Sequence, residues 1–438
     1  MPLHAGAATR RINPEIGDDL AGQLHRRFCQ RHRDDLEANL LYVSNHDTAV
    51  ILGSLDLLWL GEHRVVRRMR EAIHRATGVP ERKIILGCTH THSGPYVADR
   101  LFIHDAPPNP EFQDKLEKRL VAAAEEAVET AGPVTAGWAQ GRAHVGHNRR
   151  MCWADGSHTM YGDATREDFT GVEGPDDPAH SVLALRDEDG RFVGIVHNNC
   201  CHAICVEQSD FSSADFPGEA RRGIREALDQ KVPVLYLQGA GGDVAPWNLT
   251  SENPRYSRDR LLKEVGGRVA SETLRLLHHL DTVSDPVLSH ALEDTEVAVR
   301  LPSEEDLEWA RGVEERGEEQ AGRGDYVIAV SGVLALQEMY GDDPTEVVPV
   351  HALRIGDFAV ATNPCELYCQ FGLDIKRRSP AGGTAVSQLT DGGCGYCPTI
   401  YGVLGGGYSG RAIRWCRLEP YAGYRLVDTT ARLLHSLW

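Results

Sequence analysis

The chain has 438 residues, 41% of them hydrophobic and 25% charged, so it can bury one large core or two modest ones. Its net charge of −18, from 46 basic and 64 acidic residues, argues against nucleic acid and anionic membrane surfaces as partners. No segment approaches the run of about 18 apolar residues that a membrane helix needs, and the first residues do not form a secretory signal. We therefore expect a cytoplasmic protein without membrane insertion.

Strand-like and helix-like segments alternate along the chain. Residues 39–43 and 48–60 predict strands, and 62–77 predicts an amphipathic helix that ends at Gly78. Further strands are expected at 83–88, 134–148, 181–187, 191–200, 232–239, 287–300, 347–356 and 358–363, and further helices at 111–132, 218–229, 256–280, 303–320, 325–341, from Glu366 and at the end of the chain. Residues 153–178 and 391–410 predict long loops. The pattern predicts one α/β domain, 1–438, with mixed β-sheets flanked by α-helices.

Two histidines follow the apolar strand in "KIILGCTHTHSGP", residues 83–95. If the chain stays extended there, His90 and His92 point the same way, because strand side chains alternate. Such a pair at a strand end could bind a metal ion. The alternative is a pair of loop histidines that cap backbone groups.

Two further segments place polar side chains after apolar strands. Residues 194–220 contain His197 and His202, with Asp215 just before an expected helix, and residues 236–248 end a strand in glycines and Asp243. An aspartate beside a ligand histidine can fix its tautomer, so Asp215 or Asp243 could serve that role. The alternatives are a satisfied core histidine and an ordinary strand-to-helix turn.

A carboxylate and a phenol come from the last quarter of the chain. Glu366 follows "FAVATNPC" at an expected helix start, where the helix dipole favours a carboxylate, and Tyr396 lies in the loop "DGGCGYCPTIYG". Glu366 could be either a helix-capping residue or a metal ligand.

The eleven cysteines are odd in number and cannot all pair internally, and in a cytosolic chain most should be reduced thiols. Four of them, Cys365, Cys369, Cys394 and Cys397, have a spacing that could close a structural zinc site. That site would make the protein a non-catalytic module. The cysteines could also pack as small apolar residues.

Together, and in this order, these segments resemble the neutral/alkaline ceramidase family, zinc amidases that cleave N-acyl sphingosines. The similarity includes "TRRINPEIGDDLAGQ", "THTHSGP", "HNRR" (147–150), "CHAICV", "SSADFPG", "GDVAP", "NPCE" and "GYCPT". It implies a fold like the ceramidase N-terminal domain and a Zn²⁺ cofactor. The implied zinc ligands are His90, His202, Glu366 and Tyr396.

The resemblance also implies that His92 transfers a proton or contacts substrate and that Arg149 faces the substrate carbonyl. A zinc-activated water would attack that carbonyl. With Asp215 and Asp243 orienting the histidines, these four residues complete the predicted active site.

Two departures from the family pattern bear on the substrate. Ala245 stands where the family has the serine of its Gly-Asp-Val-Ser-Pro segment, and we expect no C-terminal immunoglobulin-like domain. We therefore expect a zinc hydrolase that cleaves an amide of a small molecule and has little activity on ceramide. Ester, lactone or C–C cleavage on the same scaffold is the alternative reaction, and a homo-oligomer is compatible with the sequence.

Overall fold

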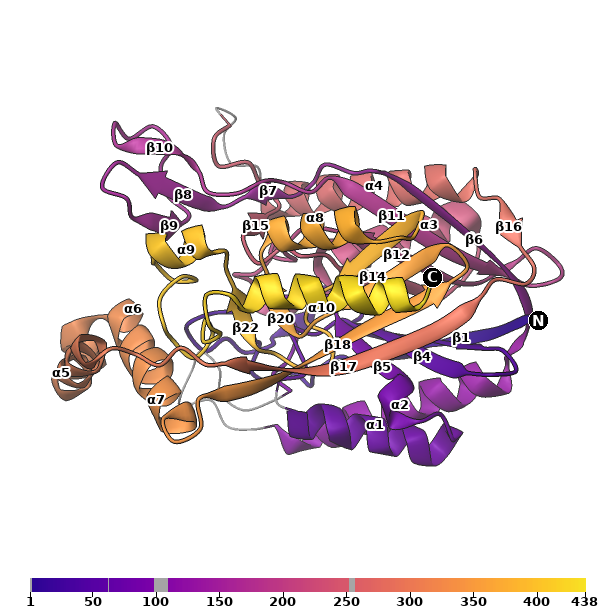
Figure 1. Ribbon diagram of the computed structural model, residues 1–438, viewed down its shortest axis with the longest axis horizontal. Coiled ribbons are helices and arrows are strands. Elements are labelled where there is room, and N and C mark those ends of the chain that lie inside the picture. Colours follow the sequence, from indigo (N-terminus) through magenta and orange to yellow (C-terminus); the bar gives the residue numbers. More distant parts are fainter. Residues whose placement is uncertain (1, 62, 98–108, 252–256) are drawn as a thin grey trace.

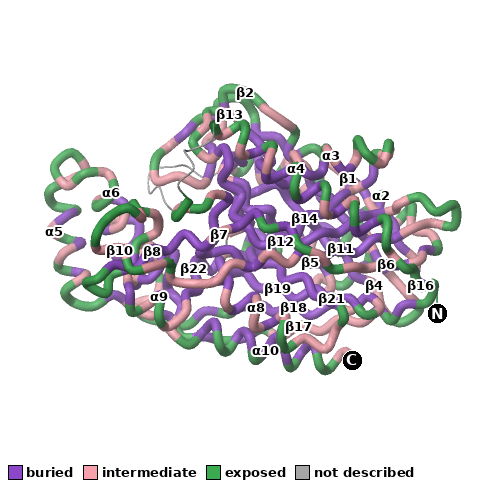
Figure 2. The backbone as a smooth tube through the Cα atoms, turned by 90° about the horizontal axis from the view of Figure 1, so that it is seen from above, coloured by how far each residue is buried: buried purple, intermediate pink, exposed green. Residues whose placement is uncertain are grey.

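Two β-sheets packed face to face, with helices on both outer faces, form the body of the protein (Figure 1). The computed structural model describes residues 2–61, 63–97, 109–251 and 257–438. Buried residues concentrate along the centre of the body, and exposed residues lie at its periphery (Figure 2). In the described part of the chain, no helix combines the length and the apolar character needed to cross a membrane.

The larger sheet has nine strands and mixed pairing. Its order is β14 (Val234–Gln238), β12 (Phe192–Asn199), β11 (Ala179–Arg186), β6 (Gly132–Arg142), β1 (Leu3–Arg11), β3 (Glu37–Ser44), β4 (Ala49–Leu55) and β5 (Ile84–Cys88), with β16 (Thr282–Val283) paired to β6. The β4–β5 and β12–β14 pairs are parallel, and the other pairs are antiparallel. Ser54 of β4 donates to the Tyr236 carbonyl of β14 (2.7 Å), so strands near the two ends of the order meet.

The two faces of this sheet follow strand alternation. In β3, Leu41 faces the second sheet, while Leu40 faces the helices α1 (His63–Thr77) and α2 (Pro110–Glu129). In β14, Leu235 faces the second sheet, and Tyr236 packs under α3 (Asp215–Leu228) and α4 (Arg258–Leu277). Both helix pairs therefore cover the outer face of the larger sheet.

The smaller sheet runs in the order β17 (Leu288–Ala298), β18 (Thr345–Ile355), β19 (Phe358–Thr362) and β21 (Gly383–Ser387). Leu353 and Phe358 contribute to the core between the sheets. The opposite face packs against α8 (Cys369–Arg378) and α10 (Ala422–Ser436). At one end of the body lie α5 (Glu304–Ala321), α6 (Arg323–Tyr326), a π-helix (Val327–Leu334) and α7 (Ala335–Tyr340) (Figure 1).

The mixed α/β architecture is confirmed, and several predicted bounds are wrong. The strand predicted at 48–60 ends at Leu55, and the one predicted at 134–148 divides into β6 and β7 (His147–Asn148). The predicted loop 153–178 instead completes a small sheet of β8 (Arg150–Trp153), β9 (His158–Met160) and β10 (Phe169–Val172). Within 391–410, β22 (Gly395–Cys397) and α9 (Ile400–Gly405) replace part of the predicted loop. The first residues of two predicted helices, 62 and 256, lie outside the described residues.

Three short pairings complete the fold. They join β2 (Arg31–His32) to β13 (Phe211–Ser212), β7 to β15 (Val244–Ala245), and β20 (Cys365–Leu367) to β22. The last two pairings bring distant segments of the chain to one place, and that place is the candidate site.

Candidate metal centre

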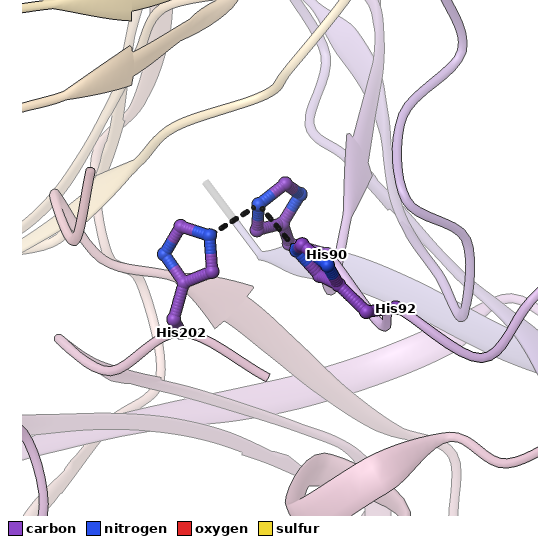
Figure 3. Close-up of side chains that lie close together, drawn as sticks. All are labelled: His90, His92 and His202. Atoms are coloured by element: carbon purple, nitrogen blue, oxygen red, sulfur yellow. Dashed lines mark hydrogen bonds between the residues drawn. The ribbon is translucent and has the colours of Figure 1, made fainter. Parts of the chain in front are cut away.

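Three imidazoles from two distant segments converge at one end of the sheets (Figure 3). His90 and His92 follow β5, and His202 follows β12. The ring centroids lie 4.3 Å apart for His90 and His202 and 4.7 Å apart for His90 and His92. The chain is not extended between the first two, because His90 has a left-handed backbone with φ = 64°. This conformation is uncommon for a residue with a side chain and is often found at functional sites.

Each of the three imidazoles uses Nδ1 to contact a main-chain carbonyl. The bonds join His90 to Leu58 (2.9 Å), His92 to Gly22 (2.8 Å) and His202 to Gly241 (2.8 Å). A carbonyl oxygen only accepts, so Nδ1 carries the proton in each ring. In the neutral ring, Nε2 then presents a lone pair.

The three Nε2 atoms point toward one another. His90 Nε2 lies 2.8 Å from His202 Nε2 and 3.2 Å from His92 Nε2. Two lone pairs cannot hydrogen-bond to each other, so these short separations require a cation or a shared proton between the rings. The donor atoms of the three histidines lie within 4.8 Å of one another, close enough for a single metal ion.

Glu366 adds a carboxylate to the same cluster. Its Oε2 lies 3.4 Å from His90 Nε2 and 3.5 Å from His202 Nε2, and this buried oxygen has no hydrogen-bond partner. Donor atoms around one tetrahedral zinc ion are separated by about 3.3 Å, given the usual zinc–ligand bond lengths. The residues present therefore fit a divalent cation such as zinc.

Glu366 does not lie at a helix start, contrary to the prediction. It is the central residue of β20, and α8 begins at Cys369. β20 pairs in parallel with β22, and in this register Glu366 is the Cα partner of Tyr396. The short two-stranded sheet thus places the predicted carboxylate and phenol ligands side by side.

Arg149 supplies the positive charge of the site. Its Nη2 donates to the Gly242 carbonyl (2.8 Å) and lies 3.2 Å from His202 Nε2 and 3.4 Å from the Tyr396 hydroxyl. Its Nη1 donates to the Tyr161 hydroxyl (2.8 Å). These contacts hold the guanidinium beside the cluster, where it can stabilise negative charge on a bound group.

Burial determines the protonation of the remaining groups. It lowers the pKa of His92 and of His202 well below the usual value, and neighbouring positive charge lowers each of them further. These rings therefore stay neutral, and each Nε2 keeps its lone pair. Burial, followed by the charge of Glu366, raises the pKa of Tyr396 well above its usual value, so the phenol keeps its proton.

Asp215 and Asp243 do not orient the histidines, contrary to the prediction, because main-chain carbonyls take that role. Asp215 accepts from the main-chain N–H of Val206 (2.9 Å). Asp243 accepts from the main-chain N–H of Cys369 (2.7 Å) and from Asn148 Nδ2 (2.8 Å), and burial raises its pKa to about 7. Through these two bonds, Asp243 links the start of α8 to β7, the strand that precedes Arg149.

Other predicted groups lie away from the cluster. His197 is buried within β12, where it contacts Thr273 (3.3 Å). The four cysteines do not form one site: Cys369 interacts with Cys200, whereas Cys365 lies with Cys394 and Cys397. Among the described residues, no group of candidate metal ligands includes them, so the structure does not support the alternative of a four-cysteine site.

Several groups around the cluster were not predicted from the sequence. The three carbonyls that orient the histidines carry no signal in the sequence, because every residue has a carbonyl. Tyr161 lies in the segment predicted as a loop, and it stacks on Trp247 with ring centroids 5.9 Å apart. The aromatic residues of segments 153–178 and 236–248 were the signal that could have pointed to Tyr161 and Trp247.

The sequence matches no family model and no curated protein. In contrast, the structure is similar to the neutral ceramidase from Pseudomonas aeruginosa, with a TM-score of 0.75 and 17% identity, over 100% of this chain and 74% of that chain. It is also similar to a ceramidase complexed with C2, with a TM-score of 0.74 and 15% identity, over 100% of this chain and 75% of that one. The chain therefore has the fold of the neutral ceramidases.

Proposed function

We propose that this protein is a zinc-dependent hydrolase that cleaves an amide bond of a small molecule. One observation carries the proposal: three proton-free imidazole nitrogens and an unpartnered, buried Glu366 oxygen face one point. The fold is consistent with it, since the structural neighbours are ceramidases. Fold alone does not fix a reaction, so the proposal depends on the chemistry of the site.

His90, His202, Glu366 and Tyr396 are the proposed zinc ligands. Two imidazoles and a carboxylate are groups that zinc commonly binds, and a nearby cation would lower the pKa of the phenol. His92 Nε2 belongs to the same group of donor atoms, so it would lie beside the ion, where we assign it proton transfer. When bound, zinc would polarise the scissile carbonyl and acidify a water molecule.

The chain's own residues would manage charge and protons. Arg149 Nη2, which lies 3.4 Å from the Tyr396 hydroxyl, would donate to the carbonyl oxygen as it becomes negative. His92 is less buried than His90 and His202, and its Nδ1 is held by Gly22. Its Nε2 would accept a proton from the attacking water and deliver it to the leaving amine.

Ala245 limits the substrate. It lies fully buried in β15, paired with His147 of β7, and its methyl group cannot act as a nucleophile or hydrogen-bond donor. We therefore propose that the substrate is a small molecule other than long-chain ceramide. We also propose that residues 1–438 form a single catalytic domain. The cytoplasmic location remains a prediction.

The proposal is tested by metal content and hydrolysis in wild type and His202→Ala. We expect about one tightly held zinc per wild-type chain and cleavage of at least one N-acyl amide in preference to the esters and lactones of the same panel. His202→Ala should lose the ion and at least a thousandfold of the activity, as when a central catalytic group is removed.

His180→Ala is the matched control. His180 is also a buried histidine on the larger sheet, but its Nε2 contacts Thr273 (2.8 Å) and not the cluster. This variant should lose stability and keep its zinc. Tightly held, stoichiometric zinc in His202→Ala that survives His144→Ala in the same chain would contradict the ligand assignment. Preferential cleavage of esters or lactones would contradict the amide assignment.

A further inference from the structure

A second group of potential metal ligands lies outside the candidate centre. His144 Nε2 lies 3.1 Å from Asp176 Oδ2, and His147 Nδ1 lies 3.5 Å from the same oxygen. The two imidazole centroids are 4.6 Å apart. The donor atoms of the three residues all lie within 4.8 Å of one another, as they do in the buried histidine cluster.

The backbone that carries these groups is fixed before any ion binds. The main-chain N–H of Asn148 donates to Asp176 Oδ1 (2.6 Å), which holds the carboxylate over the 144–147 segment. Asn199 Nδ2 donates to the Ala143 carbonyl (3.0 Å). Gly146 packs so closely on the Cys200 carbonyl that a Cβ there would lie 2.2 Å from it. A preorganised segment loses little conformational freedom when a ligand binds.

The position of the group allows an ion to enter and keep open coordination positions. The side chain of His144 is 53% exposed, and those of His147 and Asp176 are 21% and 30% exposed. His144 also lines an open groove of about 600 Å³ beside α4. Water molecules could therefore complete the coordination.

We propose that His144, His147 and Asp176 form a second, surface site for a divalent transition-metal ion. Two imidazoles and one carboxylate suit Zn²⁺, Co²⁺, Ni²⁺ or Cu²⁺, whereas Mg²⁺ and Ca²⁺ prefer sites made only of oxygen ligands. The separations of 3.1 and 3.5 Å bracket the value of about 3.3 Å expected around one tetrahedral ion. This proposal does not rest on the proposed hydrolase function.

The ion would act on the segment that leads to the candidate centre. His147 and Asn148 form β7, which pairs with β15, and Arg149 follows directly. The main-chain N–H of Arg149 donates to the Asp243 carbonyl (2.8 Å). An ion at the surface site would therefore tie β7 to Asp176 and stabilise the segment that positions the guanidinium.

The test is a calorimetric titration of Zn²⁺ into the full chain after its most tightly held ion has been loaded. Wild type should bind one additional ion, and His144→Ala should weaken that binding by at least tenfold. An Asp176→Asn variant, which keeps the side-chain shape, should weaken it as well. Mg²⁺ or Ca²⁺ at the same concentration should not compete.

His46→Ala is the control, because His46 is also an exposed histidine beside an aspartate, Asp47 at 3.1 Å, but it lies in no described metal-binding group. It should titrate like wild type. With Co²⁺ or Zn²⁺ in crystals, an anomalous scattering peak is expected among the three side chains. Failure of wild type to bind the additional ion, or equal affinity in His144→Ala, would overturn the proposal.

Discussion

The Tyr396 hydroxyl is a polar group in an almost fully buried place. Its side chain is 4% exposed, and Arg149 Nη2 is the donor 3.4 Å away. Tyr396→Phe removes the oxygen and keeps the ring, so the fold should be retained. We expect turnover to fall by about a hundredfold or more, because the variant lacks one proposed zinc ligand and even losing a group that only supports a ligand costs roughly 10–100-fold.

The measurement for Tyr396→Phe is kcat on the best substrate of the panel, with circular dichroism to check folding. Tyr401→Phe is the control, because Tyr401 lies on α9 with 55% of its surface exposed. A wild-type rate in Tyr396→Phe would remove this residue from the proposed site.

The residues that come together were predictable, and what orients them was not. His90, His202, Glu366 and Tyr396 were named from a family resemblance carried by short motifs, and the structure gathers the first three and places Tyr396 beside Glu366. The carbonyls that fix the ring tautomers belong to segments up to 70 residues away, as for His92 and Gly22. A main-chain carbonyl is common to all residues, so only the fold can select one.

At the level of secondary-structure elements, Gly242 allows the segment after β14 to lie close to β20. A Cβ at Gly242 would lie 2.4 Å from the Glu366 carbonyl oxygen, and the Gly242 N–H donates to the Leu367 carbonyl (2.9 Å). The segment after β14 therefore lies directly against β20. Any side chain at position 242 must push β20, and with it the Glu366 carboxylate, away from the histidines.

Gly242→Ala should consequently retain most of its fold and lose at least tenfold in both zinc affinity and activity, since small displacements of catalytic groups have large effects.

Gly267→Ala is the matched control. Gly267 lies on an exposed face of α4, where a Cβ would meet no atom within 4 Å. This change should leave activity intact and stabilise the helix by roughly 0.5–1 kcal/mol. Wild-type zinc affinity in Gly242→Ala would contradict the tight packing.

Long elements were predicted better than short ones, for a physical reason. α1 and α2 have enough turns for an apolar face to show in the sequence, and the strands of the larger sheet show apolar runs. β20 has three residues and was taken for the start of α8. Its pairing with β22 depends on a contact between residues about 30 positions apart, which no local pattern contains.

Across the whole molecule, a buried carboxylate connects the first helix to the segment that precedes the last one. Glu346 of β18 accepts from Arg417 Nε (2.7 Å) and from the Tyr340 hydroxyl (2.5 Å), and its other oxygen lies 3.2 Å from His63 Nε2 of α1. Burial alone would raise the pKa of Glu346, but Arg417 and the hydrogen bonds overcome this effect and lower it from 4.5 to about 2. The charged form is therefore the one that stabilises the fold.

The lowered pKa of Glu346 determines how the free energy of unfolding changes with pH. Because the folded-state pKa lies below the unfolded value of 4.5, the contribution of Glu346 is complete above that pH and is lost as the pH falls toward about 2. Glu346→Gln should lower the free energy of unfolding at pH 7 by on the order of 3 kcal/mol, at about 1.4 kcal/mol per pKa unit. Urea denaturation should show a constant gap to wild type from pH 5 to pH 8 that narrows below about pH 4.5. Glu296→Gln is the control, at an exposed position of the neighbouring strand β17, and its free energy of unfolding should stay close to that of wild type at every pH. If the difference between Glu346→Gln and wild type widened in acid, that result would contradict the assigned role.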